Sequence, residues 1–160
     1  MAEKKRELTQ AEKQQAEIAY QQFYDEALRD PTKYLKHDVD AHNDEALYRL
    51  ASRHGMDYYG WYWLLAENLA GRRGSSYDVS DDMGWERLAW DLSCMQRMSV
   101  DDCKEFVALL ATLDLISREH LSEMHLVTIN RIRKDKEEYA RAIAQKRLGA
   151  WKTNQKRLYG

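Results

Sequence analysis

Apolar residues recur every three or four positions along most of this chain, the spacing that places side chains on one face of an α-helix. The stretches with this period lie at about 9–29, 43–54, 57–69, 81–92 and 99–113, and another begins near residue 127. Two segments have a different pattern. Residues 77–80 predict a short extended piece, and residues 115–128, with a polar turn at 118–120, predict a small β-hairpin.

Capping residues mark the predicted helix ends. Thr9-x-x-Glu12 and Ser99-x-x-Asp102 fit capping boxes, in which two side chains satisfy backbone N–H groups that lack helical partners. Asn43 is the expected N-cap of the second helix, and Gly55 is expected to end it. The helix after residue 80 is expected to be capped near Asp81 or Asp82, whereas Asp30-Pro31 ends the first helix.

The resulting order is helix, short strand, helix, helix, hairpin, which is the order of a winged helix. We therefore expect a mainly α fold: a winged-helix-like domain with a small β-hairpin, plus N-terminal and C-terminal helices. The expected divisions are an N-terminal helical extension at 1–35, the winged-helix-like domain at 36–128 and a basic C-terminal helix or tail at 129–160.

The first helix carries an apolar face, from Ala16 to Ala27, that needs a partner surface. Either the domain itself or a second copy of the chain can supply it, and a homodimer would be the simplest closed assembly. Tyr20 and Phe23 lie on this face and are candidates for protein contact.

Composition narrows the class of protein. The chain has 160 residues, 44% of them hydrophobic and 32% charged, with a single proline, which suits one helical core of ordinary size. No apolar run approaches the roughly 18 residues that span a bilayer, and the N-terminus has no signal-like segment. We expect a cytoplasmic protein without membrane contact, in which Cys94 and Cys103 are buried, reduced thiols.

The net charge of −2 hides an asymmetry. Residues 127–160 hold ten Lys or Arg against three acids, a charge of +7, so the other 126 residues carry −9. Phosphate contacts need Lys and Arg, so the tail is the expected site of any polyanion. Lys134, Arg141, Lys152 and Lys156 are predicted to share one face of the last helix, roughly opposite Ile132, Tyr139, Ile143 and Ala150.

Chemistry-bearing patterns are weak. The turn at 37–44 lacks the glycine and the final acid of a calcium loop, so it is expected to be structural, with no metal. Residues 71–76 lack the lysine of a phosphate loop, although Arg72 and Arg73 are candidates to touch a phosphate. No catalytic motif is present in the sequence, which predicts a protein that is not an enzyme and needs no cofactor.

Two further surfaces bear on function. The helix that a winged-helix protein would lay in the DNA major groove exposes Asp101, Asp102 and Glu105 against one base, Lys104, so sequence-specific reading by it is not expected. The five rings between Tyr58 and Trp63 are expected in the core. Trp90 and Trp151 fall off the apolar stripes and are candidates for a contact surface.

The run at 36–69 carries a family resemblance, as KHDVDAHNDEALYRLASRHGMDYYGWYWLLAENL. The residues that carry it are His37, Asp38, Asp40, Ala41, Asn43, Asp44, Gly55, Met56, Asp57, Tyr59, Gly60, Tyr62, Trp63 and Glu67. In these positions the chain resembles the N-terminal domain of phage and prophage replisome-organiser proteins, which resemble DnaD-type replication initiators in their winged-helix fold. The resemblance covers about residues 36–128 and departs from the usual pattern at Tyr58, where a second glycine is common.

The resemblance implies a non-enzymatic phage or prophage protein of the bacterial cytoplasm that binds DNA weakly and non-specifically and assembles with itself or with replication proteins. The alternative hypothesis is a phage inhibitor that uses the acidic body, with Asp101, Asp102 and Glu105, to occupy a host nucleic-acid-binding protein such as a defence nuclease.

Overall fold

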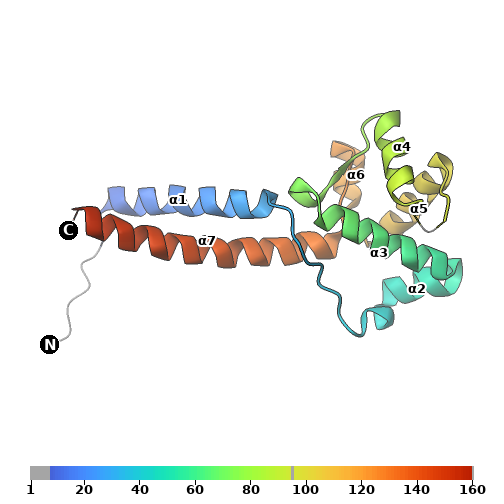
Figure 1. Cartoon of the computed structure of the whole chain (residues 1–160), viewed down its shortest axis with the longest axis horizontal. Coiled ribbons are helices and arrows are strands. Elements are labelled where there is room, and N and C mark those ends of the chain that lie inside the picture. Colours follow the sequence, from blue (N-terminus) through green and yellow to red (C-terminus); the bar gives the residue numbers. More distant parts are fainter. Residues whose placement is uncertain (1–7, 95, 160) are drawn as a thin grey trace. The chain divides into compact units, whose positions relative to one another are not determined.

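The computed structural model describes residues 8–94 and 96–159, which form two compact units. One is a globular unit within residues 30–135; the other is a helical pair formed by the described residues 8–29 and 136–159. In chain order the elements are α1 (Gln10–Arg29), η1 (Ala41–Asn43), α2 (Glu45–His54), α3 (Met56–Ala70), η2 (Arg73–Ser75), β1 (Tyr77–Asp78), α4 (Asp82–Asp91), α5 (Val100–Thr112), α6 (Arg118–Met124), β2 (Leu126–Val127) and α7 (Asn130–Tyr159) (Figure 1). None of the described helices is long and apolar enough to cross a membrane.

The core of the globular unit is built around α3. Trp61 and Tyr62 are buried, and Tyr58, Tyr59 and Trp63 are half-buried against the core, which confirms the interpretation of the aromatic helix as core. Burial raises the pKa of the Tyr62 hydroxyl to about 12. Outside α3, the largest fully buried side chains come from α2, from α4 and its C-cap, from α5 and from the strand segments: Leu47, Leu50, Leu88, Leu92, Phe106, Val107, Leu110, Ile116 and Ile129.

A small antiparallel sheet closes the unit, as the fold prediction requires. β1 pairs with β2, with Tyr77 opposite Val127, and Ile116 forms a bridge to Ile129. The segment at 126–129 therefore lies between β1 and the segment around Ile116. The expected polar turn at 118–120 is wrong, because these residues begin α6, whose N-cap Ser117 accepts a hydrogen bond from the His120 N–H. A helix thus replaces the turn of the predicted hairpin.

Most predicted caps are confirmed. Both capping boxes form: the Thr9 N–H lies 2.7 Å from Glu12 Oε2, and Ser99 pairs reciprocally with Asp102. Asp81 caps α4, and Gly55 follows α2 with a φ of 95°. The second helix departs by one residue. Its N-cap is Asp44, which accepts from the N–H groups of residues 46 and 47, whereas Asn43 ends the preceding 3₁₀ turn.

In the helical pair, α1 runs antiparallel to the C-terminal part of α7 (Figure 1). Three alanines of α1 and two of α7 are buried, which lets the backbones approach closely: Ala16, Ala19, Ala27, Ala140 and Ala144. An ion pair of 3.1 Å also joins Arg147 of α7 to Glu26 of α1. The apolar face of α1 thus has its partner within the same chain.

Three expectations about side-chain burial are wrong. The buried stripe of α7 contains Ile132 but continues through the alanines, while Tyr139 is 52% exposed and Ala150 is also exposed, because the stripe follows steps of four residues. The spacing of Leu47, Leu50 and Ala51 also predicts His54 on the inner face of α2, but His54 is exposed in the last turn of that helix. Cys103 is buried but Cys94 is exposed, since it lies in the turn after α4; both are free thiols.

Candidate nucleic-acid and protein interfaces

The helix α5 is fixed in the core by its inner face and presents an acidic outer face. Cys103, Phe106, Val107 and Leu110 are fully buried, and burial raises the pKa of the Cys103 thiol to about 12, so it stays protonated and unreactive at neutral pH. The outer face exposes three acids and one base, with two small or polar residues: Asp101, Asp102, Lys104, Glu105, Ala108 and Thr112.

The charges on this face do not favour DNA. Asp102 is held in the capping box of Ser99, whereas Asp101 and Glu105 have no ion-pair partner in the described part of the chain. The ammonium of Lys104 lies 5.7 Å from the centre of the Trp85 ring, a distance at which a cation is attracted to the ring face. The surface that would meet a major groove would therefore repel phosphates.

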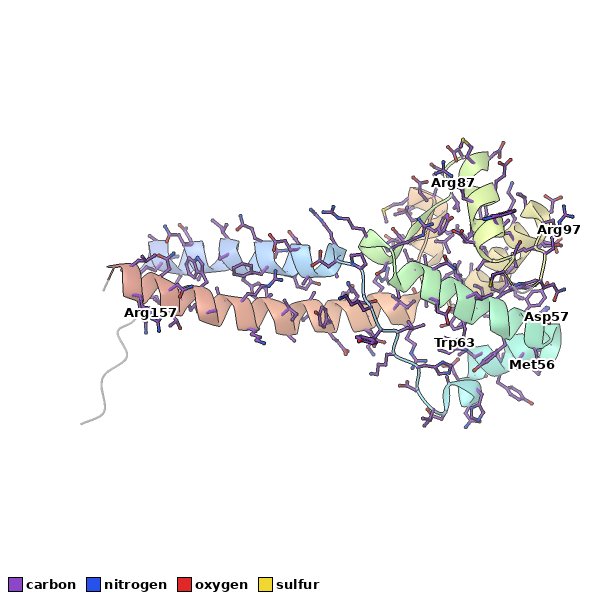
Figure 2. The ribbon with its side chains drawn as sticks, viewed as in Figure 1. Met56, Asp57, Trp63, Arg87, Arg97 and Arg157 are labelled. Carbon is purple, nitrogen blue, oxygen red and sulfur yellow. The ribbon has the colours of Figure 1, made fainter. Side chains whose placement is uncertain are left out.

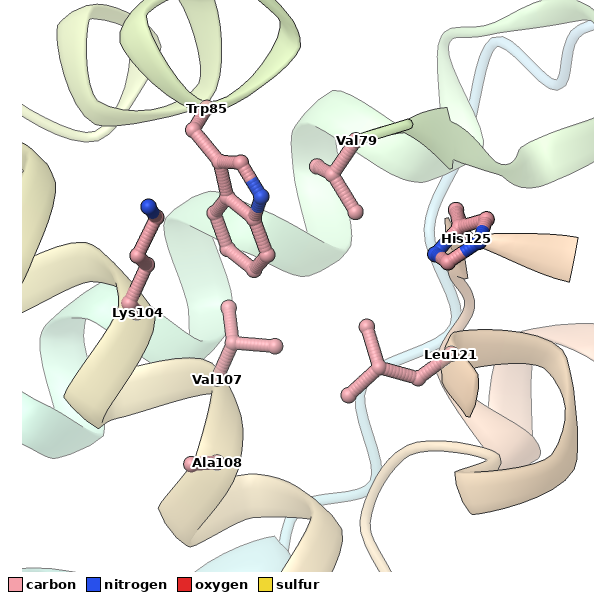
Figure 3. A pocket seen from close by; sticks show the side chains of 7 residues that line it. All are labelled: Val79, Trp85, Lys104, Val107, Ala108, Leu121 and His125. Carbon is pink, nitrogen blue, oxygen red and sulfur yellow. The ribbon is translucent and has the colours of Figure 1, made fainter. Parts of the chain in front are cut away.

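Beside α5 lies a hollow of about 350 Å³, here called the α5 groove (Figure 3). Its lining comes from four separate segments of the sequence: Val79, Trp85, Lys104, Val107, Ala108, Leu121 and His125. The aliphatic side chains of Val79, Val107 and Leu121 face the indole of Trp85 across it (Figure 3). This groove could not be predicted from the sequence, because no local motif links residues 79, 85, 107 and 121.

Arg72 is engaged inside the globular unit. Its guanidinium carbon lies 3.9 Å from the centre of the Tyr77 ring, and one of its nitrogens donates to Asp91 at 3.2 Å. The Tyr77 hydroxyl donates to the same carboxylate at 2.7 Å, and burial together with this bond raises the Tyr77 pKa to about 12. Arg73 is exposed in η2. A phosphate contact would therefore compete with the interactions of Arg72 with Tyr77 and Asp91.

The predicted basic residues of α7 fall into different units. Lys134 belongs to the globular unit, whereas Arg141, Lys152 and Lys156 belong to the helical pair. All four are exposed. Arg141 lies 3.8 Å from the carboxylate of Glu137, while Lys152 and Lys156 form no ion pair within the described residues.

The aromatic contact candidates differ in exposure. Trp90, on the outer face of α4, is 80% exposed, and Figure 2 places Arg87 on the same helix and Arg97 in the turn that follows. Trp151 is half-buried in the helical pair. Tyr20 and Phe23 are also half-buried there, and Tyr20 stacks on Tyr24 with ring centres 6.3 Å apart. Trp90 is thus the most accessible ring of these four candidates.

The turn at 37–44 is tied to the globular unit by its side chains. His37 stacks on Trp63, with ring centres 3.8 Å apart and planes 9° from parallel, and Asp38 forms an ion pair with Arg131 (Trp63 is labelled in Figure 2). Asp44 is used as the cap of α2. Among the described residues no group of three His, Cys, Asp or Glu side chains is placed to hold a metal ion.

No family model, no curated protein and no solved structure matches this chain.

Proposed function

We propose that this chain is a non-enzymatic phage or prophage protein, similar to the N-terminal domains of replisome organisers, that acts in the cytoplasm of a bacterial host. It binds nucleic acid weakly, without sequence preference, through the basic face of α7. It assembles with itself or with replication proteins.

The observation that carries the proposal is the separation of charge between the two units. Residues 30–135 contain thirteen Lys or Arg and nineteen Asp or Glu, a net charge of −6, whereas the remaining residues contain twelve and eight, a net charge of +4. Lys152 and Lys156 are exposed and without ion-pair partners in the described chain, so their charge is available to a phosphate backbone. The family resemblance at 36–69 agrees with a role in replication.

The test is DNA binding as a function of salt, measured by fluorescence anisotropy with two duplexes of unrelated sequence. Both should bind equally, and log affinity should fall with log salt by about 0.9 per phosphate neutralised. The variant R141Q/K152Q/K156Q should lose most of its affinity, and its slope should be shallower by about 2.7.

A matched variant removes the same charge from the globular unit. K33Q/R53Q/R97Q changes three exposed bases, and it should bind DNA nearly as the parent chain does. If both triple variants lost the same DNA affinity, the loss would reflect the change in net charge and not the position of the bases on α7. No measurable binding by the parent at about 50 mM salt, where counterion release favours association, would refute the proposed DNA contact.

The acidic face of α5 supports a second function, inhibition of a host nucleic-acid-binding protein such as a defence nuclease. Asp101 and Glu105 are exposed carboxylates free of ion pairs in the described chain, and such a surface can stand in for a phosphate backbone. In that case the chain should lack DNA affinity. The variant D101K/E105K should then lose inhibition of the captured nuclease, and R141Q/K152Q/K156Q should keep it.

A further inference from the structure

The α5 groove is an apolar hollow that remains open beside the core of the globular unit. Val107 at its base is fully buried and Val79 is 5% exposed, whereas Leu121 and Trp85 are half-buried at its walls. Its volume of about 350 Å³ lies at the low end of the roughly 300–1,000 Å³ typical of ligand pockets. It therefore has room for one or two apolar side chains.

Exposed acidic residues lie close to the groove in the sequence and on the helix α5. Ala108 lines the groove, and at 100° per residue Asp101 and Glu105 lie along the same side of α5 as Ala108, within two turns. Asp78 precedes Val79 and interacts electrostatically with His125, which lines the groove; hydrogen bonds from Ser80 lower the pKa of Asp78, so it is charged at neutral pH.

Asp82, also exposed, begins the helix that carries Trp85. The basic side chains that line the groove are Lys104, placed near the Trp85 ring, and His125. Four exposed carboxylates thus lie on the segments that form the groove, whose own lining holds one lysine and one histidine. An occupant that brings negative charge would be repelled, and one that brings Lys or Arg would be attracted.

We propose that the α5 groove is a docking site for a basic segment of another protein. The segment inserts one or two apolar side chains between Trp85 and Leu121, and its Lys or Arg residues pair with Asp101 and Glu105. This inference rests on the protein-binding part of the proposed function and is independent of DNA binding by α7.

The test is a titration of the full-length, ¹⁵N-labelled chain with two short synthetic peptides. Both carry leucines at the same two positions; one has Lys and the other Glu at every flanking position. The Lys peptide should shift the amide signals of Val79, Ala108 and Leu121, and the Glu peptide should not.

Two variants of α5 separate the groove from general effects. Ala108→Trp fills the groove and should lower the affinity for the Lys peptide by at least about tenfold, or about 1.4 kcal/mol. Thr112→Trp adds the same bulk four residues later, at an exposed site outside the groove, and should bind as the parent does. Because residues 108 and 112 are both exposed, both variants should keep the parent's circular dichroism. D101K/E105K should reverse the preference in favour of the Glu peptide.

Other results would overturn the proposal. Equal binding of both peptides, or undiminished binding by Ala108→Trp, would remove the groove as the site. If duplex DNA caused the same amide shifts, the occupant of the groove would be nucleic acid. If a higher protein concentration alone caused them, the occupant would be a second copy of the chain. R141Q/K152Q/K156Q should leave peptide binding unchanged, so a failure of DNA binding is distinguishable from a failure of the groove.

Discussion

Gly84 allows α4 to lie against β1, and this contact can be tested by adding a single methyl group. A Cβ atom at residue 84 would lie 2.3 Å from the carbonyl oxygen of Asp78 and 3.0 Å from the Cα of Val79. Both are backbone atoms, so a side-chain rotation cannot relieve the overlap. Since Val79 lines the α5 groove, the same contact also positions one of its walls.

The cost of Gly84→Ala follows from two opposing effects. Overpacking of a well-packed site costs about 1–3 kcal/mol, and the clash here is with backbone, which favours the upper end. Alanine in a helix gains about 1 kcal/mol over glycine. The net expectation is a loss of about 2 kcal/mol in the free energy of unfolding of the globular unit.

Gly60 supplies the control. It lies within α3, is exposed, and a Cβ there would have no atom within 4 Å outside its own helix backbone and chain neighbours, so Gly60→Ala should stabilise the unit by about 0.5–1 kcal/mol. Urea unfolding followed by tryptophan fluorescence reports mainly on this unit, because Trp61, Trp63, Trp85 and Trp90 lie in it. A Gly84→Ala variant as stable as the parent, or two variants that shift in the same direction, would refute the packing described here.

Three further predictions concern the two thiols, two tyrosines and one ion pair. Iodoacetamide at pH 7.5 should alkylate Cys94 quickly and leave Cys103 unmodified in the native protein, since only Cys94 is exposed and burial holds the Cys103 pKa near 12; mass spectrometry would reveal the contrary. The pKa values of Tyr62 and Tyr77 are raised to about 12 in the folded chain, so the contribution of these two groups to stability should be fully present below pH 10 and be lost between pH 10 and 12, less steeply in Tyr77→Phe; a flat urea midpoint from pH 10 to 12 would contradict this. The half-exposed pair of Glu26 and Arg147 should show a coupling of no more than about 1 kcal/mol in a double-mutant cycle of thermal melts, and less at high salt; a coupling of several kcal/mol would mean that the pair is far better shielded than its exposure indicates.

Local signals in the sequence predicted the helices well. Reciprocal capping at Thr9 and Ser99, the turn residue Gly55 and the helical period of the apolar positions each act over a few residues, so they can be recognised without the fold. The mainly α fold with a small antiparallel β element is confirmed for this reason. The N-cap of α2 was predicted one residue too early, because Asn43 and Asp44 can accept the same hydrogen bonds and the sequence does not distinguish them.

Features made by distant segments could not be predicted in the same way. The partner of β2 is β1, some fifty residues earlier, and the pairing of Ile116 with Ile129 leaves a loop long enough to form α6. The α5 groove also needs four segments to come together. The buried face of α7 depends on the alanines of α1, so periodicity alone placed Tyr139 on the wrong side.

The acidic face of α5 can be predicted from the sequence, but the contacts that Arg72 and Lys104 make with aromatic rings cannot. The stacking of Arg72 on Tyr77 and the approach of Lys104 to Trp85 are tertiary contacts between side chains 5 and 19 residues apart in the sequence. They explain why two residues that look available as bases have structural partners.

The central claim is that α7, and not α5, meets nucleic acid, and lysine footprinting tests it most directly. The full chain would be treated with an amine-acetylating reagent with and without duplex DNA, and the acetylation rate of each lysine measured by mass spectrometry. DNA should protect Lys152 and Lys156, while Lys33 and Lys104, which lie in the acidic globular unit, should react at unchanged rates. Protection of Lys104 with no change at Lys152 and Lys156 would contradict the account.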